Sequence, residues 1–197
     1  SQRQIAAKIL IENRAVVNSH LQRTVGGKVS FTHLIGYAIV EALSEMPQLN
    51  VRYVLQDGKA AVEELAHVGF GLAIDIQHGG ERRLVVPVIH DADTLTFTQF
   101  VDAYQDIIAR AKKGELTAED YQGATVTLTN PGTIGTTTSV PRLMSGQGLI
   151  IGVGAMDYPA EFAGVSPRKL ALMGIGKTMF VSSTYDHRVI QGAASGE

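Results

Sequence analysis

A histidine with charged neighbours lies near the carboxyl end of the chain, in the segment Tyr185-Asp186-His187-Arg188. An imidazole between an acid and a base can be held in one tautomer and can take up a proton near neutral pH. The segment therefore makes His187 a candidate for acid–base chemistry. The alternative is an exposed histidine beside a local ion pair, which is the commoner fate of a single histidine.

A second candidate is the hydroxyl-rich loop of residues 127–138, which reads Thr-Leu-Thr-Asn-Pro-Gly-Thr-Ile-Gly-Thr-Thr-Thr. Gly132 and Gly135 permit close approach of the backbone to a ligand, and the threonines supply donors for a developing negative charge. The loop lacks the Lys-Ser/Thr pair of a phosphate-binding P-loop and the dinucleotide fingerprint. Composition alone favours the alternative, a polar surface loop.

Asp75 lies in an apolar stretch and must find a partner or water. A site role and simple solvation both remain open for it. A histidine metal site is not expected, because the other histidines lack metal-ligand spacing. These are His20, His33, His67, His78 and His90. We interpret His33 as structural or solvated.

The bulk composition excludes several classes of function. The 197 residues carry a formal net charge of −2, which does not favour electrostatic capture of nucleic acid or an anionic membrane. The absence of cysteine excludes disulfides, thiolate metal sites and a cysteine nucleophile, and it fits a cytoplasmic location. The chain has no apolar stretch near the roughly 20 residues that span a bilayer. It begins without methionine, and we expect it to be a fragment of a longer polypeptide.

The hydrophobic pattern predicts the elements that carry these segments. An Asp-Gly turn at residues 57–58 indicates a hairpin, and Gly114 closes a helix. Helices are expected over residues 7–23, 31–46 and 97–113, and strands over 51–55, 60–63, 68–76, 83–89, 125–129, 149–155 and 179–184. Irregular interleaving of helices and strands favours one α+β or mixed α/β domain with one large sheet.

Taken in order, these motifs resemble the catalytic domain of the 2-oxoacid dehydrogenase dihydrolipoyl acyltransferases, relatives of chloramphenicol acetyltransferase. Residues 68–89 resemble the family's paired strands ending in V-P-V-I, and residues 127–135 its T-I-S/T-N-x-G loop. Residues 185–192 resemble its Y-D-H-R-x-x-D-G signature. The match runs from about Ser30 to Glu197. It implies an α+β fold, a mixed α/β sandwich of the chloramphenicol acetyltransferase type with a large mixed sheet flanked by helices. Residues 1–197 would then form one acyltransferase catalytic domain.

The resemblance also implies roles for single residues. His187 would be the base that deprotonates the thiol of coenzyme A, and Thr129 would donate to the oxyanion. Gln191 stands where the signature usually has Asp, which changes the local electrostatics, and it would fix the loop after His187 by hydrogen bonding. Asp186 and Arg188 would form a structural ion pair. Residues implied at the coenzyme A side are Asp75, Asn130, Gly132, Thr133 and Gly135.

More narrowly, residues 26–33 and 183–192 are similar to the multifunctional 2-oxoglutarate dehydrogenases of actinobacteria. In these, an acyltransferase-like domain precedes a decarboxylase that uses thiamine diphosphate and Mg, a portion absent from this chain. The resemblance implies succinyl transfer in the 2-oxoglutarate dehydrogenase reaction. Coenzyme A would be a substrate, and a lipoylated acyltransferase would supply the lipoyl group in trans.

The same resemblance implies a homotrimer with active sites between subunits, which works with the other components of a 2-oxoacid dehydrogenase complex. The competing hypothesis is a non-catalytic trimeric scaffold for the fused decarboxylase. Gln191 favours the scaffold, whereas retention of Thr129 and His187 opposes it.

Overall fold

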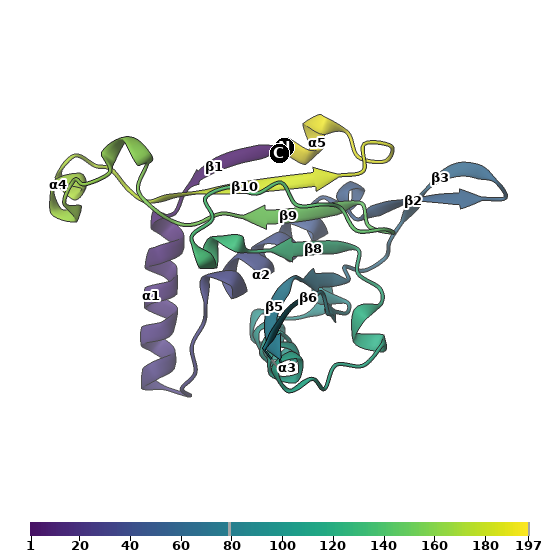
Figure 1. Ribbon diagram of the computed structural model, residues 1–197, viewed down its shortest axis with the longest axis horizontal. Helices are drawn as coiled ribbons and strands as arrows, with labels where there is room; N and C mark the ends of the chain where they lie inside the picture. The colour runs from purple at the N-terminus through teal and green to yellow at the C-terminus, as the bar shows by residue number, and fades with distance from the viewer. Residues whose placement is uncertain (79, 197) are drawn as a thin grey trace.

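A six-stranded mixed sheet forms the centre of the computed structural model, which describes residues 1–78 and 80–196. Its strand order is β1-β10-β9-β8-β4-β7 (Figure 1). β8 runs parallel to both its neighbours, β4 and β9, while the remaining pairs are antiparallel. The strands are β1 (Gln2–Ala6), β4 (Phe70–Leu72), β7 (Val88–Ile89), β8 (Val126–Thr129), β9 (Leu149–Val153) and β10 (Thr178–Tyr185). The prediction of one large mixed sheet is confirmed.

Helices form where the sequence predicts the three long ones. They are α1 (Lys8–Arg23), α2 (Phe31–Glu45) and α3 (Phe97–Lys113), with shorter α4 (Pro167–Leu172) and α5 (Gly192–Gly196). The Ser30 hydroxyl caps α2 by accepting from the amide of His33. Gly114, at φ 73°, ends α3 in the left-handed conformation that glycine adopts most easily.

The core lies between the sheet and the helices α2 and α3. Phe70 of β4 and Phe100 of α3 are fully buried, with their ring centroids 5.7 Å apart. Gly36 of α2 faces both rings, and a Cβ there would stand 3.1 Å from Phe100. The lack of a side chain at Gly36 thus lets α2 and α3 pack closely over the sheet. This packing fixes β4 and β8, whose ends carry or adjoin candidate site residues.

Two hairpins extend from this centre. β2 (Val51–Gln56) and β3 (Lys59–Glu64) project from one end of the molecule (Figure 1). Their turn has positive φ at Asp57 and Gly58, as the predicted Asp-Gly hairpin requires. The other hairpin pairs β5 (Ile74–His78) with β6 (Glu81–Val85).

The predicted single strands 68–76 and 83–89 are wrong, because each is divided between two sheets. β4 belongs to the large sheet, and the chain leaves it after Ala73 to form β5. On the return, β6 ends before Pro87, which has no amide to donate to a strand neighbour. The strand β1 and the helix α4 had no predicted counterpart. In the described part of the chain, no helix is long and apolar enough to cross a membrane.

Candidate active site

The end of β10 places His187. The last pair of β10 with β9 joins Tyr185 to Leu149, and the next amide, that of Asp186, donates to the carbonyl of Gly148 at 2.9 Å. The carbonyl of Asp186 then accepts from the amides of residues 189 and 190. This tight turn leaves the side chain of His187 exposed.

Asp186 and Arg188 form the predicted ion pair. The guanidinium donates from Nε to Oδ1 at 2.9 Å and from a terminal nitrogen to Oδ2 at 2.6 Å. This bond holds the pKa of the Asp186 carboxyl below its usual value. Both carboxylate oxygens thus face Arg188 rather than His187. The imidazole makes no hydrogen bond within the described residues, and its ring lies 5.6 Å from that of Tyr185. Asp186 therefore does not fix the tautomer of His187 directly.

Gln191 also lies at this end, with an exposed side chain. Its backbone carbonyl accepts from the amide of Ser195 at 3.1 Å as α5 forms. Its side-chain amide makes no hydrogen bond to any described residue. Among the described residues, backbone bonds hold this loop, and the hydrogen-bonding role of the Gln191 side chain stays a prediction. The amide is left available to another group.

Thr129 is the last residue of β8 and belongs to the second candidate segment, the hydroxyl-rich loop of residues 127–138. Its side chain is half-buried, and its hydroxyl makes no hydrogen bond to a described residue. The side-chain amide of Asn130 donates from Nδ2 to the hydroxyl of Thr32 at 3.0 Å, which ties this loop to the first turn of α2. The hydroxyl of Thr133 donates to the carbonyl of Asn130 at 3.0 Å. The loop is thus fixed while Thr129 keeps its donor free.

The two loop glycines, Gly132 and Gly135, are needed for the backbone packing and the turn of this chain. A Cβ at Gly132 would stand 2.3 Å from the carbonyl of Gly154, so the loop backbone lies directly against the end of β9. Gly135 has φ 91°, which suits glycine. Both glycines shape the loop beside Thr129, and their contact with a ligand stays a prediction.

Asp75 lies in β5, close to the same end of the sheet. The preceding strand β4 runs beside β8, and the amide of Ala73 donates to the carbonyl of Leu128. The exposed carboxylate of Asp75 forms an ion pair with Arg82, and this bond lowers the pKa of the carboxyl. Asp75 thus shares an end of the sheet with Thr129, with its charge already balanced.

The strand register separates the two groups of predicted residues. Thr129 pairs with Gly152, and Gly152 pairs with Ser182, three residues before the end of β10. With about 3.3 Å per residue and 4.8 Å between strands, Thr129 lies roughly 14 Å from the end of β10. His187 follows two residues beyond that end. The arrowheads of β8 and β10 point in opposite directions in Figure 1, so one chain does not bring Thr129 and His187 together.

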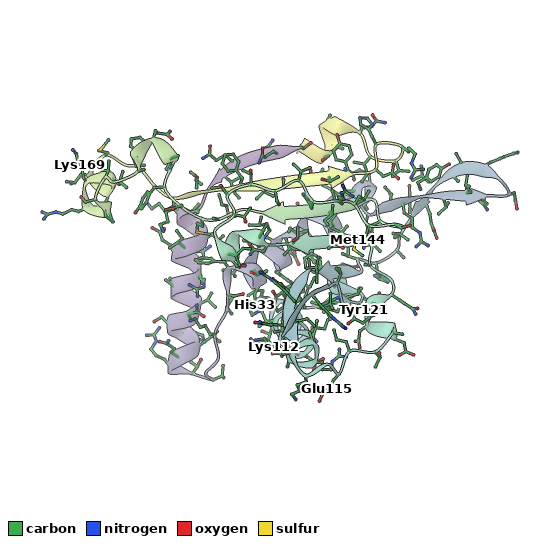
Figure 2. All side chains as sticks on the ribbon, in the orientation of Figure 1. His33, Lys112, Glu115, Tyr121, Met144 and Lys169 are labelled. Atoms are coloured by element: carbon green, nitrogen blue, oxygen red, sulfur yellow. The ribbon has the colours of Figure 1, made fainter. Side chains whose placement is uncertain are left out.

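Two features were missed by the sequence patterns. An apolar cavity of about 660 Å³ lies between α2 and the strands β1, β9 and β10, lined by Ile39, Leu43 and Ile151 among others, and by none of the predicted site residues. His33 is buried, and its burial lowers the pKa of the imidazole. It borders a smaller cavity together with Lys112 (Figure 2). Within the described residues, no group of three or more acidic, cysteine or histidine side chains could hold a metal.

Comparison with known proteins gives one consistent result. Residues 1–197 match the sequence profile of the family described as 2-oxoacid dehydrogenases acyltransferase (catalytic domain). The multifunctional 2-oxoglutarate metabolism enzyme of Mycobacterium sp. (strain JLS) is 59% identical over 198 residues, all of this chain. The chain spans only 16% of the length of that relative.

Solved structures agree on the fold. The cubic core of a pyruvate dehydrogenase multienzyme complex is 25% identical, with a TM-score of 0.80 over all of this chain and 75% of its own. Azotobacter vinelandii dihydrolipoamide acetyltransferase, studied for the role of a serine, a histidine and an asparagine in its mechanism, is also 25% identical, with a TM-score of 0.81 over 100% and 75%. A chloramphenicol acetyltransferase, 15% identical with a TM-score of 0.55 over 98% and 80%, confirms the predicted fold class.

Proposed function

Because this chain belongs to the family of 2-oxoacid dehydrogenase acyltransferases, we propose that it transfers a succinyl group between a dihydrolipoyl carrier and coenzyme A. The observation that carries the proposal is that two side chains, at the two ends of one sheet, make no hydrogen bond to any described residue. His187 is exposed without a hydrogen bond to a described residue, and the hydroxyl of Thr129 is equally free. The similarity to multifunctional 2-oxoglutarate metabolism enzymes supports the succinyl group.

The active site is completed between two copies of the chain. Since the register places Thr129 and His187 at opposite ends of the sheet, a site needs His187 from one copy and Thr129 from another. A cyclic trimer supplies three such junctions, and the likeness to a multienzyme core supports a closed assembly of this kind. The residues on the coenzyme A side, among them Asn130 and Asp75, come from the copy that supplies Thr129.

The reaction is a direct transfer. The imidazole of His187 takes the proton of the coenzyme A thiol, whose pKa near 8.5 leaves little thiolate at neutral pH. The sulfur attacks the carbonyl carbon of the lipoyl thioester, and the hydroxyl of Thr129 donates to the resulting oxyanion. The oxyanion collapses, the bond to the lipoyl sulfur breaks, and protonated His187 returns its proton to that sulfur. No acyl-enzyme forms, so the absence of cysteine is no obstacle.

Comparison with the Azotobacter enzyme supports these roles. Its histidine and asparagine are four positions apart, as are His187 and Gln191 here. A side-chain amide thus occupies the same spacing in both, and the third residue studied there is a serine, which like Thr129 carries a hydroxyl. The free amide of Gln191 then acts across the junction or on the substrate. This argues against reading Gln191 as a sign of lost activity.

The partners follow from the chemistry. The acyl donor is a lipoyl group carried by another acyltransferase protein, and the other components of a 2-oxoacid dehydrogenase complex supply its succinyl group. Thiamine diphosphate and Mg belong to the decarboxylase step. A cytoplasmic location stays a prediction.

The test is reversible succinyl transfer between succinyl-coenzyme A and dihydrolipoamide by the purified trimer. His187→Ala should lower the rate by about 100- to 10,000-fold, the usual contribution of a general base. His20→Ala, an exposed histidine of α1, is the matched control and should leave the rate unchanged. An inactive wild-type trimer, tested with acetyl and succinyl groups and a lipoylated donor domain, would refute transfer and leave the scaffold hypothesis.

A further inference from the structure

Arg188 lies between a carboxylate and an aromatic ring. On one side its guanidinium donates to both carboxylate oxygens of Asp186, through the two bonds described above. On the other, its guanidinium carbon stands 3.7 Å from the centroid of the Tyr53 ring. That distance is well within the range of a cation–π contact, about 6 Å. The residue that directly follows His187 in the chain is therefore held from two sides.

Tyr53 comes from β2, and the start of this strand is tightly fixed to the same part of the sheet. Gly148 makes the contact: a Cβ there would stand 2.0 Å from the carbonyl of Val51. The same Gly148 accepts the amide hydrogen of Asp186 through its own carbonyl. One residue thus brings together the base of β2 and the turn that carries His187.

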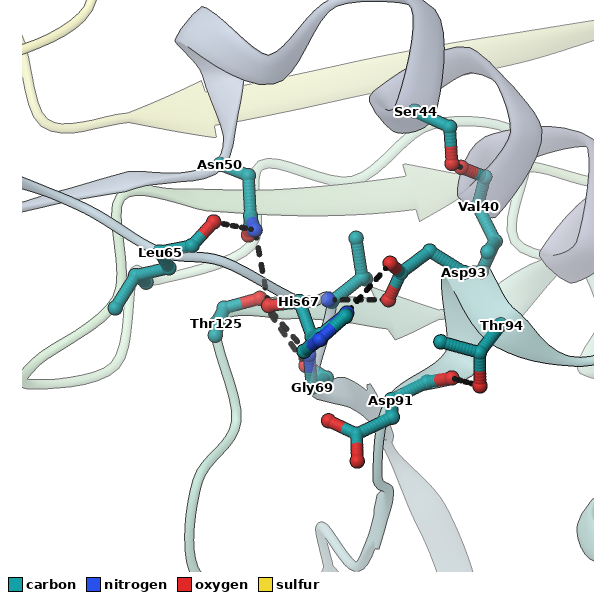
Figure 3. Close-up of polar contacts among 11 residues, drawn as sticks. Val40, Ser44, Asn50, Leu65, His67, Gly69, Asp91, Asp93, Thr94 and Thr125 are labelled. Carbon is teal, nitrogen blue, oxygen red and sulfur yellow. Dashed lines mark hydrogen bonds and ion pairs between the residues drawn. The ribbon is translucent and has the colours of Figure 1, made fainter.

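Asn50 fixes the base of the β2–β3 hairpin. It is buried, and its side-chain amide donates to the carbonyls of Leu65 and His67 at 3.0 Å each (Figure 3). The carbonyl of Asn50 also accepts from the amide of Leu65 at 3.1 Å. Both ends of the β2–β3 hairpin are therefore held together where it leaves the sheet. This keeps the ring of Tyr53 at a fixed place beneath Arg188.

His187 has no comparable support of its own. Its ring makes no hydrogen bond to a described residue and has one ring contact, with Tyr185 at 5.6 Å, so its orientation depends largely on the backbone of its two neighbours. Asp186 is held by Gly148, and Arg188 is held by Asp186 and Tyr53. Removing the aromatic face would leave Arg188, already 62% exposed, with a carboxylate partner alone.

We propose that Tyr53 is a positioning residue for His187, acting through its stack on Arg188 and not by touching substrate. The interaction needs an aromatic face and not the phenolic hydroxyl, because the ring quadrupole provides the attraction. A test of this role by kcat rests on the proposed transferase function. A test by the orientation of the His187 ring does not depend on that function.

The experiment compares Tyr53→Leu with Tyr53→Phe and with Leu55→Ala, a control two residues along β2 whose side chain is 67% exposed. Loss of the stack should lower kcat by about 2- to 30-fold, as a contact of 0.5–2 kcal/mol implies, with KM unchanged. Tyr53→Phe and Leu55→Ala should keep the wild-type kcat. Thermal midpoints, measured alongside, show whether each variant is folded at the assay temperature.

A second readout separates this inference from the proposed function. The ring proton resonances of His187, assigned by their loss in His187→Ala, should move or broaden in Tyr53→Leu and stay in place in Tyr53→Phe. If wild type is inactive, the transferase proposal fails while these resonances still test Tyr53. Equal kcat in folded Tyr53→Leu and Tyr53→Phe, or unmoved resonances in Tyr53→Leu, would overturn the role of Tyr53.

Discussion

Two inactive variants of this chain should restore activity when they assemble together. Thr129→Val removes the oxyanion donor, which typically lowers the rate about 100- to 1,000-fold, and His187→Ala removes the base. Because roughly 14 Å separates Thr129 from the end of β10, an intact site takes the two residues from different chains. A junction between a Thr129→Val chain and a His187→Ala chain can therefore hold both wild-type residues.

The size of the recovery follows from the symmetry of a ring of three. In any trimer that contains both variants, one of the three junctions joins the intact His187 of one chain to the intact Thr129 of its neighbour. Mixed trimers should thus show about one third of the wild-type kcat if the junctions act independently. An unsorted mixture assembled at random from equal amounts should show about one quarter, since a quarter of junctions pair the right chains.

The assay uses the two variants co-expressed with different affinity tags, so that tandem purification yields mixed trimers only. Succinyl transfer to dihydrolipoamide is then measured per trimer. Mixed trimers of Thr129→Val with the double variant Thr129→Val/His187→Ala are the control, because no junction in them contains an intact Thr129. Mixed trimers of the single variants that are no more active than this control would refute a site shared between chains.

Three further outcomes are expected. Thr129→Ser should keep most of the activity that Thr129→Val loses, since the hydroxyl is retained, as kcat would show. Gly132→Ala should lower the free energy of unfolding by about 1–3 kcal/mol or more, because its Cβ meets backbone at 2.3 Å. Gly176→Ala, with nothing within 4 Å, is the control in thermal melts. Asp186→Asn should lower the thermal midpoint at pH 7, since Arg188 depresses the pKa of the Asp186 carboxyl. That stabilisation is present above the unfolded-state pKa of about 3.9 and disappears as pH falls through the native value, so the two melting curves should converge in acid. A constant gap would contradict it.

Local sequence determined much of the fold because the decisive interactions were local. Helix α3 begins at the capping threonine before Phe97 and ends at Gly114, and the Asp-Gly turn fixes the β2–β3 hairpin. Neither depends on distant residues. The prediction of a single strand over residues 68–76 was wrong for the opposite reason. Whether the chain stays beside β8 or leaves after Ala73 is decided by pairing with residues more than fifty positions away.

The candidate site shows the same division. The resemblance of the ordered motifs to a known family singled out His187, Thr129 and Gln191, because such motifs are visible in the sequence alone. Their separation appeared only in the register of three strands, which sets distance by strand direction and not by sequence. The contact of Tyr53 with Arg188 joins positions 135 residues apart, and no spacing pattern reports it. The chemistry was thus determined by the sequence, whereas the support of the base and the need for a second copy were decided by tertiary structure, because both depend on which backbones lie side by side.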